Sequence, residues 1–385
     1  MKKKEVLKRI QLGEDSQTQF KENFTNSEQL AAEMVALCNA RGGLILVGIS
    51  DKGETRGLSN EDIHRLNQLI SHTATENVMP PITPLTEIIE ITDKKILVIE
   101  VKPGINKPYC TNKNIFYTKV GADKRKISRE ELLRLFQDSG HLAADEMIIY
   151  DATTADLNLD KFKKFFKKNY GASIKETGLP LDQLLQNLNL FKNGHLNLAG
   201  LLLFGEFPQR FKPVFCIKAV SFFGNDMSGS EYRNSEDITG DIENLYKDGM
   251  GFLLRSLDKL QKGRGFNTLG ILEISRVALE EVLQNALVHR SYFKNAPVRL
   301  LIFDDRVEII SPGQLPNGLT VENIKYGNTV ARNHIITSFA GRILPYRGLG
   351  TGIQRAVTEQ PDIKFINDSN GEQFIVRIPR PKKEK

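Results

Sequence analysis

Three polar side chains recur at intervals of four residues near the C-terminal end of the sequence. They are Glu281, Asn285 and His289, and they fall in a segment, 273–289, that we predict to be a helix. Residues four apart on a helix lie on the same side, one turn apart. Glu281 and Asn285 fall within an apolar arc made of Ile274, Val277, Ala278, Val282, Ala286 and Val288. A carboxylate and an amide that face a core are costly unless they are satisfied, so they either pair with other protein groups or line a cavity for a charged ligand.

Two glycine segments follow this helix in the sequence. Ser311-Pro312-Gly313 ends a predicted strand, where glycine lets the backbone approach a flat ligand. The segment 348–352 precedes a predicted helix, and spaced glycines at a helix N-terminus can hold phosphate with backbone N–H groups. A glycine run alone is a weak signal, but the three motifs in this order favour a nucleotide site. Its candidate residues are Asn285, Ser311, Gly313, Gly348, Gly350, Thr351 and Gly352.

These three motifs resemble those of the GHKL (Bergerat-fold) ATPases, the family of gyrase and the histidine kinases. Residues 281–285 resemble the N-box, and 348–352 resemble the Gly-x-Gly-x-Gly phosphate motif. The resemblance implies ATP and Mg²⁺ as cofactors, with Asn285 as a metal ligand and Glu281 as the catalytic group that activates water. Ser311 stands where the family has the aspartate that reads adenine, so the resemblance does not extend to adenine selectivity.

One branch of that family is closer than the others. Residues 285–290 and Ala331-Arg332-Asn333 resemble the C-terminal domain of proteins labelled RecG-like or described as predicted transcriptional regulators. The resemblance implies at most slow hydrolysis that depends on dimerisation or on a partner. The alternative is a fold that is kept as a scaffold and binds no nucleotide.

Basic residues in the first third of the chain are candidates for contact with nucleic acid. Lysine and arginine neutralise phosphates, and aromatic rings such as Phe116 and Tyr117 can stack on bases. The candidates are Lys21, Arg41, Lys119, Lys124, Arg125 and Lys126. The alternative is a solvated basic face, with at least one of the two aromatics in the core because neighbours on a strand point to opposite faces.

The segment 13–22, together with 39–53, resembles the Schlafen-type AlbA domain, also called the divergent AAA-4 domain. This resemblance covers about residues 10–140 and implies a module that handles nucleic acid. Some Schlafen proteins cut RNA with three metal-binding carboxylates. Glu14 matches the first, whereas Gln19 and Ser50 occupy the other two positions. Amide and hydroxyl groups lack the anionic oxygen that holds a divalent metal, so we expect binding without cutting unless nearby acids substitute, namely Asp15, Glu22 and Asp51.

The elements that must position these residues predict an α+β protein in three parts. Residues 1–145 form a Schlafen AlbA-like α/β domain, 146–265 a mixed middle region, and 266–385 a Bergerat-like α/β sandwich with helices over one sheet. In the middle region we expect a strand at 214–224, then two helical stretches and a linker at Lys262–Gly265.

Composition sets the remaining limits. The 385 residues carry a net charge of +6, and their 40% apolar content can form cores for two or three domains. The three cysteines lack metal-ligand spacing, which suits a reducing cytoplasm. We expect no membrane segment and no signal peptide, because apolar runs are short and the start is polar.

The sequence therefore predicts a cytoplasmic, ATP-binding regulator that binds DNA or RNA and assembles as a homo-oligomer. Nucleotide at the C-terminal site would modulate the grip on nucleic acid. One alternative is a metal-dependent nuclease of Schlafen type, for instance in phage defence. The other is a structural module that assembles partners through the middle region.

Overall fold

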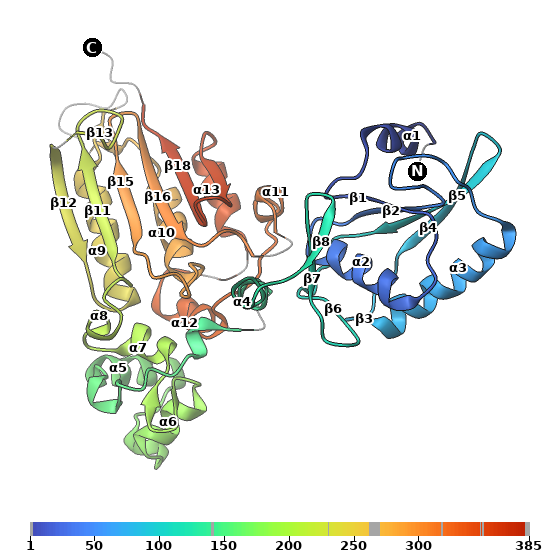
Figure 1. The fold of residues 1–385 in the computed structure, drawn as a ribbon. Helices are drawn as coiled ribbons and strands as arrows, with labels where there is room; N and C mark the ends of the chain where they lie inside the picture. The colour runs from blue at the N-terminus through green and yellow to red at the C-terminus, as the bar shows by residue number, and fades with distance from the viewer. Residues whose placement is uncertain are drawn as a thin grey trace. The chain divides into compact units, whose positions relative to one another are not determined.

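The computed structural model describes residues 3–139, 142–229, 231–261, 270–316, 319–346, 348 and 350–381. The chain divides into two compact units, Met1–His141 and Leu142–Lys385. The protein is of the α+β class, as predicted (Figure 1). None of the helices in the described ranges is long and apolar enough to cross a membrane.

The N-terminal unit is built on a four-stranded sheet with helices on both faces (Figure 1). The strands, in sheet order, are β1 (Thr18–Lys21), β2 (Gly43–Val47), β5 (Lys94–Val101) and β4 (Leu85–Ile91), and only β1 and β2 run parallel. Alternate residues of β2 serve opposite faces. Ile45 and Val47 pack with helices α2 (Ser27–Asn39) and α3 (Asn60–His72), whereas Leu44 and Leu46 pack with α1 (Lys3–Leu12).

Local capping signals explain where the helices of this unit begin. Asn26 accepts a hydrogen bond from the backbone of Gln29 and starts α2. Ser59 with Asp62, and Ser128 with Glu131, form capping boxes. The second box starts α4 (Arg129–Asp138). The remaining elements of the unit are η1 (Thr73–Asn77), β3 (Val78–Met79), β6 (Cys110–Thr111), β7 (Tyr117–Val120) and β8 (Asp123–Lys126).

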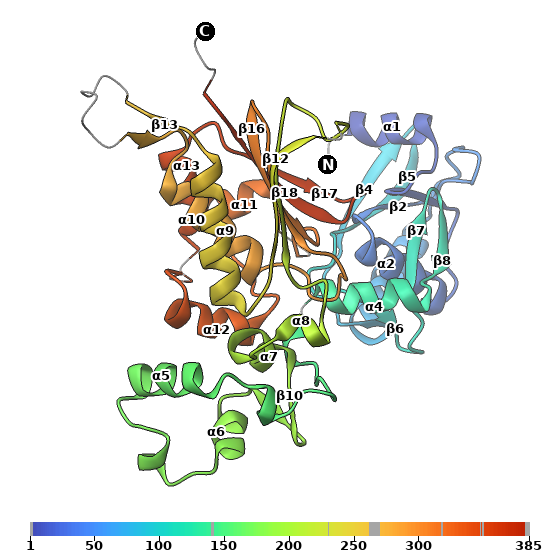
Figure 2. The same cartoon turned by 90° about the vertical axis from the view of Figure 1, so that its left-hand side faces the viewer.

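The second unit contains a six-stranded sheet with helices packed on one face (Figure 2). In sheet order its strands are β12 (Tyr232–Ile238), β11 (Ile217–Phe222), β15 (Val298–Ile302), β16 (Arg306–Pro312), β18 (Gln373–Pro379) and β17 (Lys364–Asp368). β11 and β15 run parallel, and the other described strand pairs of this sheet are antiparallel. The covering helices are α9 (Ile242–Ser256), α10 (Arg276–Val288) and α13 (Gly352–Glu359).

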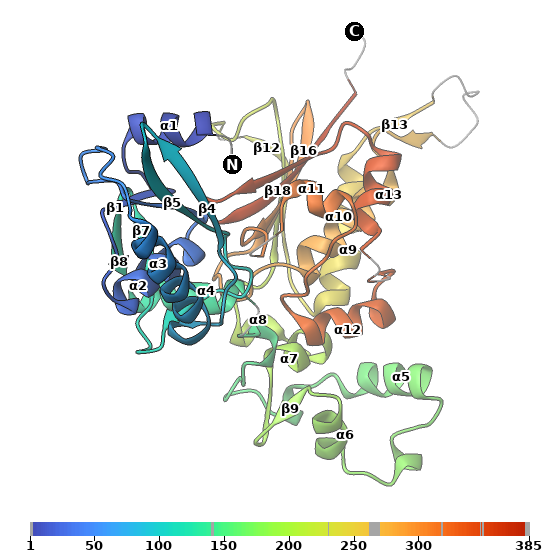
Figure 3. The same ribbon diagram turned by 90° about the vertical axis from the view of Figure 1, so that its right-hand side faces the viewer.

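A group of small elements packs beneath this sheet, next to helix α12 (His334–Ile343) (Figure 3). The ring of Phe339 on α12 lies 5.4 Å from that of Phe165 and 6.0 Å from that of Phe204, measured between centroids, so both parts share one core. The group comprises η2 (Ala144–Glu146), η3 (Thr154–Asp156), α5 (Leu159–Tyr170), η4 (Lys175–Thr177), α6 (Leu181–Asn187), β9 (Phe191–Lys192), β10 (His195–Leu196), α7 (Leu198–Phe204) and α8 (Pro208–Phe211).

The middle region of the sequence contributes directly to the six-stranded sheet. The strand predicted at 214–224 is present as β11. Of the two helical stretches expected after it, the structure has one strand, β12, followed by one helix, α9. Because β12 pairs with β11 at the edge of the sheet, its polar residues can remain exposed there. The expected linker at Lys262–Gly265 lies outside the described residues, between β13 (Lys259–Leu260) and β14 (Ile271–Leu272).

Candidate functional site

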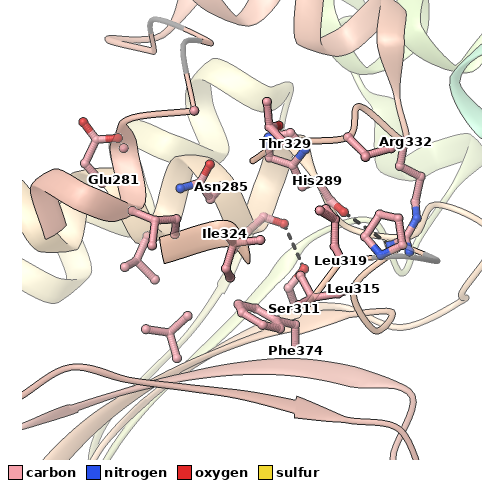
Figure 4. A pocket seen from close by; sticks show the side chains of 18 of the residues that line it. Glu281, Asn285, His289, Ser311, Leu315, Leu319, Ile324, Thr329, Arg332 and Phe374 are labelled. Atoms are coloured by element: carbon pink, nitrogen blue, oxygen red, sulfur yellow. Dashed lines mark hydrogen bonds between the residues drawn. The ribbon is translucent and has the colours of Figure 1, made fainter. Parts of the chain in front are cut away.

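The three polar residues of α10 line one cavity of the second unit (Figure 4). Ser275 caps the helix by accepting a hydrogen bond from the backbone N–H of Ala278. Glu281, Asn285 and His289 follow one another along the cavity, and its other lining residues come from β16, β18 and the connections 313–332 and 346–355. All seven candidate nucleotide-binding residues line this cavity together with Glu281.

The sheet side of the cavity is apolar. Ile309 of β16 and Phe374 of β18 belong to it, and Ile324 of helix α11 (Val321–Lys325) contributes from another direction. Apolar and aromatic walls with a few fixed polar groups are typical of small-molecule sites. This part of the cavity can accept a flat ring.

The glycine segments allow close backbone approach at two points of the cavity. Gly313 has a φ of +96°, and a Cβ there would lie 2.6 Å from the Cβ of Ser291. A Cβ on Gly352 would collide with the carboxylate of Glu281 and lie 3.6 Å from Nδ2 of Asn285. Only glycine therefore lets the start of α13 pass directly beside the two polar side chains of α10.

Glu281 is buried, with 7% of its surface exposed, and its carboxylate is already paired. Nε of Arg355, on α13, donates to Oε1 of Glu281 over 2.9 Å, and Nη2 of the same guanidinium donates to the same oxygen. Arg355 is a cavity residue that the sequence motifs did not predict. The sequence feature that could have pointed to Arg355 is its position. It lies three residues after Gly352, in the first turn of a helix that packs against α10.

Asn285 behaves differently from Glu281. It is half-buried, lines the cavity, and its side-chain amide makes no hydrogen bond with the residues that the structure describes. One amide oxygen next to a phosphate cradle fits Mg²⁺, which keeps several waters and takes few protein ligands when phosphates supply the rest. The residues present therefore fit a magnesium-bound phosphate group.

Ser311 connects the sheet to the helix. Its hydroxyl donates to the carbonyl oxygen of Ala286 over 3.1 Å, and the residue is only 7% exposed (Figure 4). Because the hydroxyl hydrogen is used in this bond, the oxygen can offer only lone pairs to a ligand.

The far end of the cavity holds a neutral histidine. Burial, and to a lesser extent the charge of Arg332, lower the pKa of His289 from 6.5 to about 4. Its Nε2 lies 2.9 Å from the hydroxyl of Tyr346, and the Arg332 guanidinium donates to the carbonyl oxygen of Gln314 over 2.8 Å. Asn333 donates to the carbonyl oxygens of Val288 and Arg290, so the Ala-Arg-Asn motif fixes the end of α10.

In the N-terminal unit, the six basic candidates fall into two groups. Lys21, Arg41 and Lys126 have no ion-pair partner among the described residues, and Arg41 and Lys126 are exposed. The other three are engaged within the protein. Lys124 pairs with the buried Glu33 over 2.6 Å, and Arg125 forms a two-pronged pair with Glu131, which lies in α4.

The structure corrects our expectation that Lys119 is a surface cation. This residue is 8% exposed, and its ammonium donates to Oε1 of Gln19 and to the carbonyl oxygen of Ala122. Burial lowers the pKa of Lys119 below its ordinary value. The aromatic candidates are also partly buried, since Phe116 packs against Phe136 of α4 and Tyr117 against the core around α2.

The candidate nuclease residues do not form a set of three carboxylates. Oε1 of Glu14 accepts from the backbone N–H of Phe20 over 2.6 Å and from the side-chain amide of Gln19. Ser50 accepts a hydrogen bond from the backbone of Glu54. The described part of the chain holds no group of three or more His, Cys, Asp or Glu residues that could bind a metal ion. At this place Gln19 binds the ammonium of Lys119, so the residues present do not fit a divalent metal.

Comparisons with protein families identify both ends of the chain. Residues 14–128 match the family described as "Schlafen, AlbA_2", and residues 295–376 match HATPase_c_4, described as "Putative ATP-dependent DNA helicase recG C-terminal". Residues 133–215 match a domain of unknown function, DUF8451. The HATPase_c_4 match includes both glycine segments but begins after α10, so Glu281 and Asn285 lie outside it.

Solved structures similar to this chain include the following two. The DIP2311 protein of Corynebacterium diphtheriae has 20% identity and a TM-score of 0.45, over 95% of this chain and 65% of its own. The N-terminal domain of a RecG-related protein from Nitrosomonas europaea has 20% identity and a TM-score of 0.24, over 32% of this chain and 93% of its own. This chain thus spans slightly less than two thirds of the first structure. No curated protein matches the sequence.

The chain carries an N-terminal Schlafen AlbA_2 domain and a C-terminal HATPase domain of RecG-like type. These two domains relate the chain to nucleic-acid-related proteins and to ATPase-type domains.

Proposed function

We propose that the protein binds ATP with Mg²⁺ in the cavity beside α10 and that bound nucleotide modulates the binding of DNA or RNA by the N-terminal unit. The observation that carries the proposal is that residues from separate parts of the sequence line the same cavity. Three segments separated in the sequence, 281–289, 311–313 and 348–352, were predicted to bind one nucleotide, and described residues of all three line one cavity.

Each part of the ligand has a suitable surface. The apolar sheet side takes the base, and the glycine segment with the N-terminus of α13 takes the phosphates. Asn285 contributes an oxygen to Mg²⁺, whose positive charge offsets the phosphates. Glu281 is the candidate base for water in a slow hydrolysis.

A direct route leads from the cavity towards the segment that follows the N-terminal unit. Arg332 lines the cavity, and α12 begins two residues later. Asp145, at the start of the second unit, accepts a hydrogen bond from the backbone N–H of Ile336 in the first turn of α12 over 3.0 Å. A ligand that moves Arg332 therefore acts on the helix that Asp145 holds.

On the N-terminal unit, Lys21, Arg41 and Lys126 are the cations proposed to contact phosphates, because other protein groups do not already neutralise them in the described structure. We further propose that the protein acts as a regulator of transcription in the cytoplasm and works as a homo-oligomer, as the ATPases that it resembles do.

The test is a titration of the protein with fluorescent ATP, with and without Mg²⁺. Asn285→Ala should weaken binding in Mg²⁺, whereas Asn295→Ala, an exposed asparagine outside the cavity, should not. Labelled single-stranded DNA and RNA are then titrated with and without ATP. Absence of saturable ATP binding by the unmodified protein would refute the nucleotide site, and equal nucleic-acid affinities with and without ATP would refute the modulation.

A further inference from the structure

Glu281, the candidate base for water, is paired with Arg355 in the cavity that holds the proposed phosphate cradle. The guanidinium contacts Oε1 of Glu281 through two nitrogens, and its Nη1 also donates to Oγ1 of Thr351 over 3.0 Å. Arg355, Thr351 and Glu281 all line the cavity. The Arg355 side chain is 38% exposed, whereas that of Glu281 is 9% exposed, so the arginine has access to the cavity and the acid is held inside.

The carboxylate of Glu281 cannot be left unpaired at low cost, because it is buried. A buried carboxylate without a cation is strongly destabilising, so Arg355 acts as the counter-ion of Glu281 in the structure. A guanidinium forms paired hydrogen bonds with phosphate as readily as with carboxylate. Arg355 lies in the first turn of α13, the helix whose start is the proposed phosphate site.

A triphosphate with bound Mg²⁺ carries both an anion and a cation. It can therefore offer a new partner to Arg355 and a new partner to Glu281. Its phosphates offer a new anion to Arg355. Mg²⁺ held by Asn285, which follows Glu281 by one helical turn, would offer a new cation to the carboxylate. A nucleoside without phosphates brings neither charge, so it leaves the pair closed.

Building on the proposed function, we propose that Arg355 senses the phosphate chain. It neutralises Glu281 when the cavity holds no phosphate, and it transfers its hydrogen bonds to the terminal phosphates of a bound nucleotide. The transfer frees the carboxylate to face the metal and its waters. Arg355 is thus a specificity residue that separates nucleoside triphosphates from shorter ligands, and Glu281 competes with the ligand for it.

The experiment compares the affinities of ATP, ADP and adenosine for four forms of the protein in Mg²⁺. These are the unmodified chain, Arg355→Gln, Glu281→Gln and Arg276→Gln. The last breaks an exposed Arg–Glu pair on the same helix and is the matched control. Thermal unfolding of each form checks that it is folded.

Arg355→Gln should lower the affinity for ATP by about tenfold, which is the scale of one charge-assisted contact. Its affinity for adenosine should stay within about twofold of that of the unmodified chain. Glu281→Gln should bind ATP at least as tightly as the unmodified chain, because the competing carboxylate is gone. If Arg355→Gln is too unstable, the double variant with Glu281→Gln removes the unpaired charge and should show the same selective loss of ATP.

A pair that serves only to join α10 to α13 gives a different pattern. Arg355→Gln would then lower the affinities for ATP and for adenosine by the same factor. Glu281→Gln would lower the affinity for ATP as much as Arg355→Gln does. Either result overturns the inference while leaving the nucleotide site in place. Absence of ATP binding by the unmodified chain overturns the proposed function as well.

Discussion

Replacement of Asp145 by alanine should destabilise the second unit by removing a helix cap that comes from a distant segment. The side chain is fully buried, and its Oδ2 accepts the backbone N–H of Ile336, the third residue of α12. The residue at the N-cap position, Asn333, makes no side-chain cap bond, and its Nδ2 donates to the carbonyl oxygens of Val288 and Arg290 instead. Asp145 supplies the missing acceptor.

The size of the effect follows from one lost cap and one orphaned donor. Loss of an N-cap costs about 0.5–2 kcal/mol, and a buried unsatisfied N–H costs about 1–3 kcal/mol. These describe the same bond, so we expect a loss of about 1–2 kcal/mol. For a unit of this size, that lowers the melting temperature by roughly 2–8 °C.

Asp145→Asn distinguishes the contribution of the hydrogen-bond acceptor to stability from the contribution of the carboxylate charge. It keeps an acceptor oxygen, and it removes a carboxylate whose pKa burial raises above the ordinary value. The folded state therefore binds this proton more tightly than the unfolded state, and the stabilising contribution, present at acid pH, is lost as pH rises through the folded pKa. The asparagine variant should match or exceed the unmodified chain at neutral pH, and its advantage should shrink on acidification.

Urea unfolding at neutral and mildly acid pH measures these differences. Asp151→Ala, an exposed aspartate six residues further along, is the control and should change stability little. Equal stability of the alanine and asparagine variants at neutral pH would show that Asp145 does not act as a cap.

The other predictions concern the cavity and the basic residues of the first unit. Burial lowers the pKa of His289 from 6.5 to about 4; the unfolded state therefore takes up this proton first, and stability should fall as pH drops from about 6.5 to 4. His289→Asn should flatten this part of a plot of unfolding free energy against pH, and an unchanged slope would contradict the assignment. Ser311→Ala should reduce any preference for ATP over GTP by about two- to tenfold in competition titrations, because Ser311 can only accept a hydrogen bond from an amino group; an unchanged ratio counts against that role. Arg41→Gln and Lys126→Gln should each lower the slope of nucleic-acid affinity against salt concentration by about one. Lys124→Met should instead destabilise the first unit by about 1–3 kcal/mol, measured by thermal unfolding, since it leaves Glu33 without this cation; unchanged stability would rule out that role.

The elements of the fold that were predicted correctly from the sequence depend on residues that are close together in the chain. The capping boxes at Ser59 and Ser128 predicted helix starts that the structure has. The predicted strand before Gly313 is β16, and the predicted closing strands are β17 and β18. In each case the signal is a side chain that bonds within one turn, or an apolar pattern with a fixed period, so no distant partner is needed.

Two errors came from the missing context of distant residues. Two helical stretches were expected after the strand at 214–224, but the polar segment Tyr232–Ile238 is a strand there, because β11 offers it an edge at which to pair. The charge of Lys119 predicted a surface position, but Gln19 and the carbonyl oxygen of Ala122 satisfy its ammonium inside the unit. Strand pairing and burial both depend on partners, and propensity alone does not supply them.

The sequence by itself indicated the kinds of domain at the two ends of the chain and their order, and it singled out residues of α10 and of the glycine segments that line one cavity. Tertiary structure alone decided which charges are already satisfied: Arg355 holds Glu281 from 74 positions away, whereas Asn285 makes no side-chain hydrogen bond in the described part of the chain. The reason is that an ionic group's state depends on its desolvation and on the distance to its counter-ion. Both quantities exist only once the chain has folded.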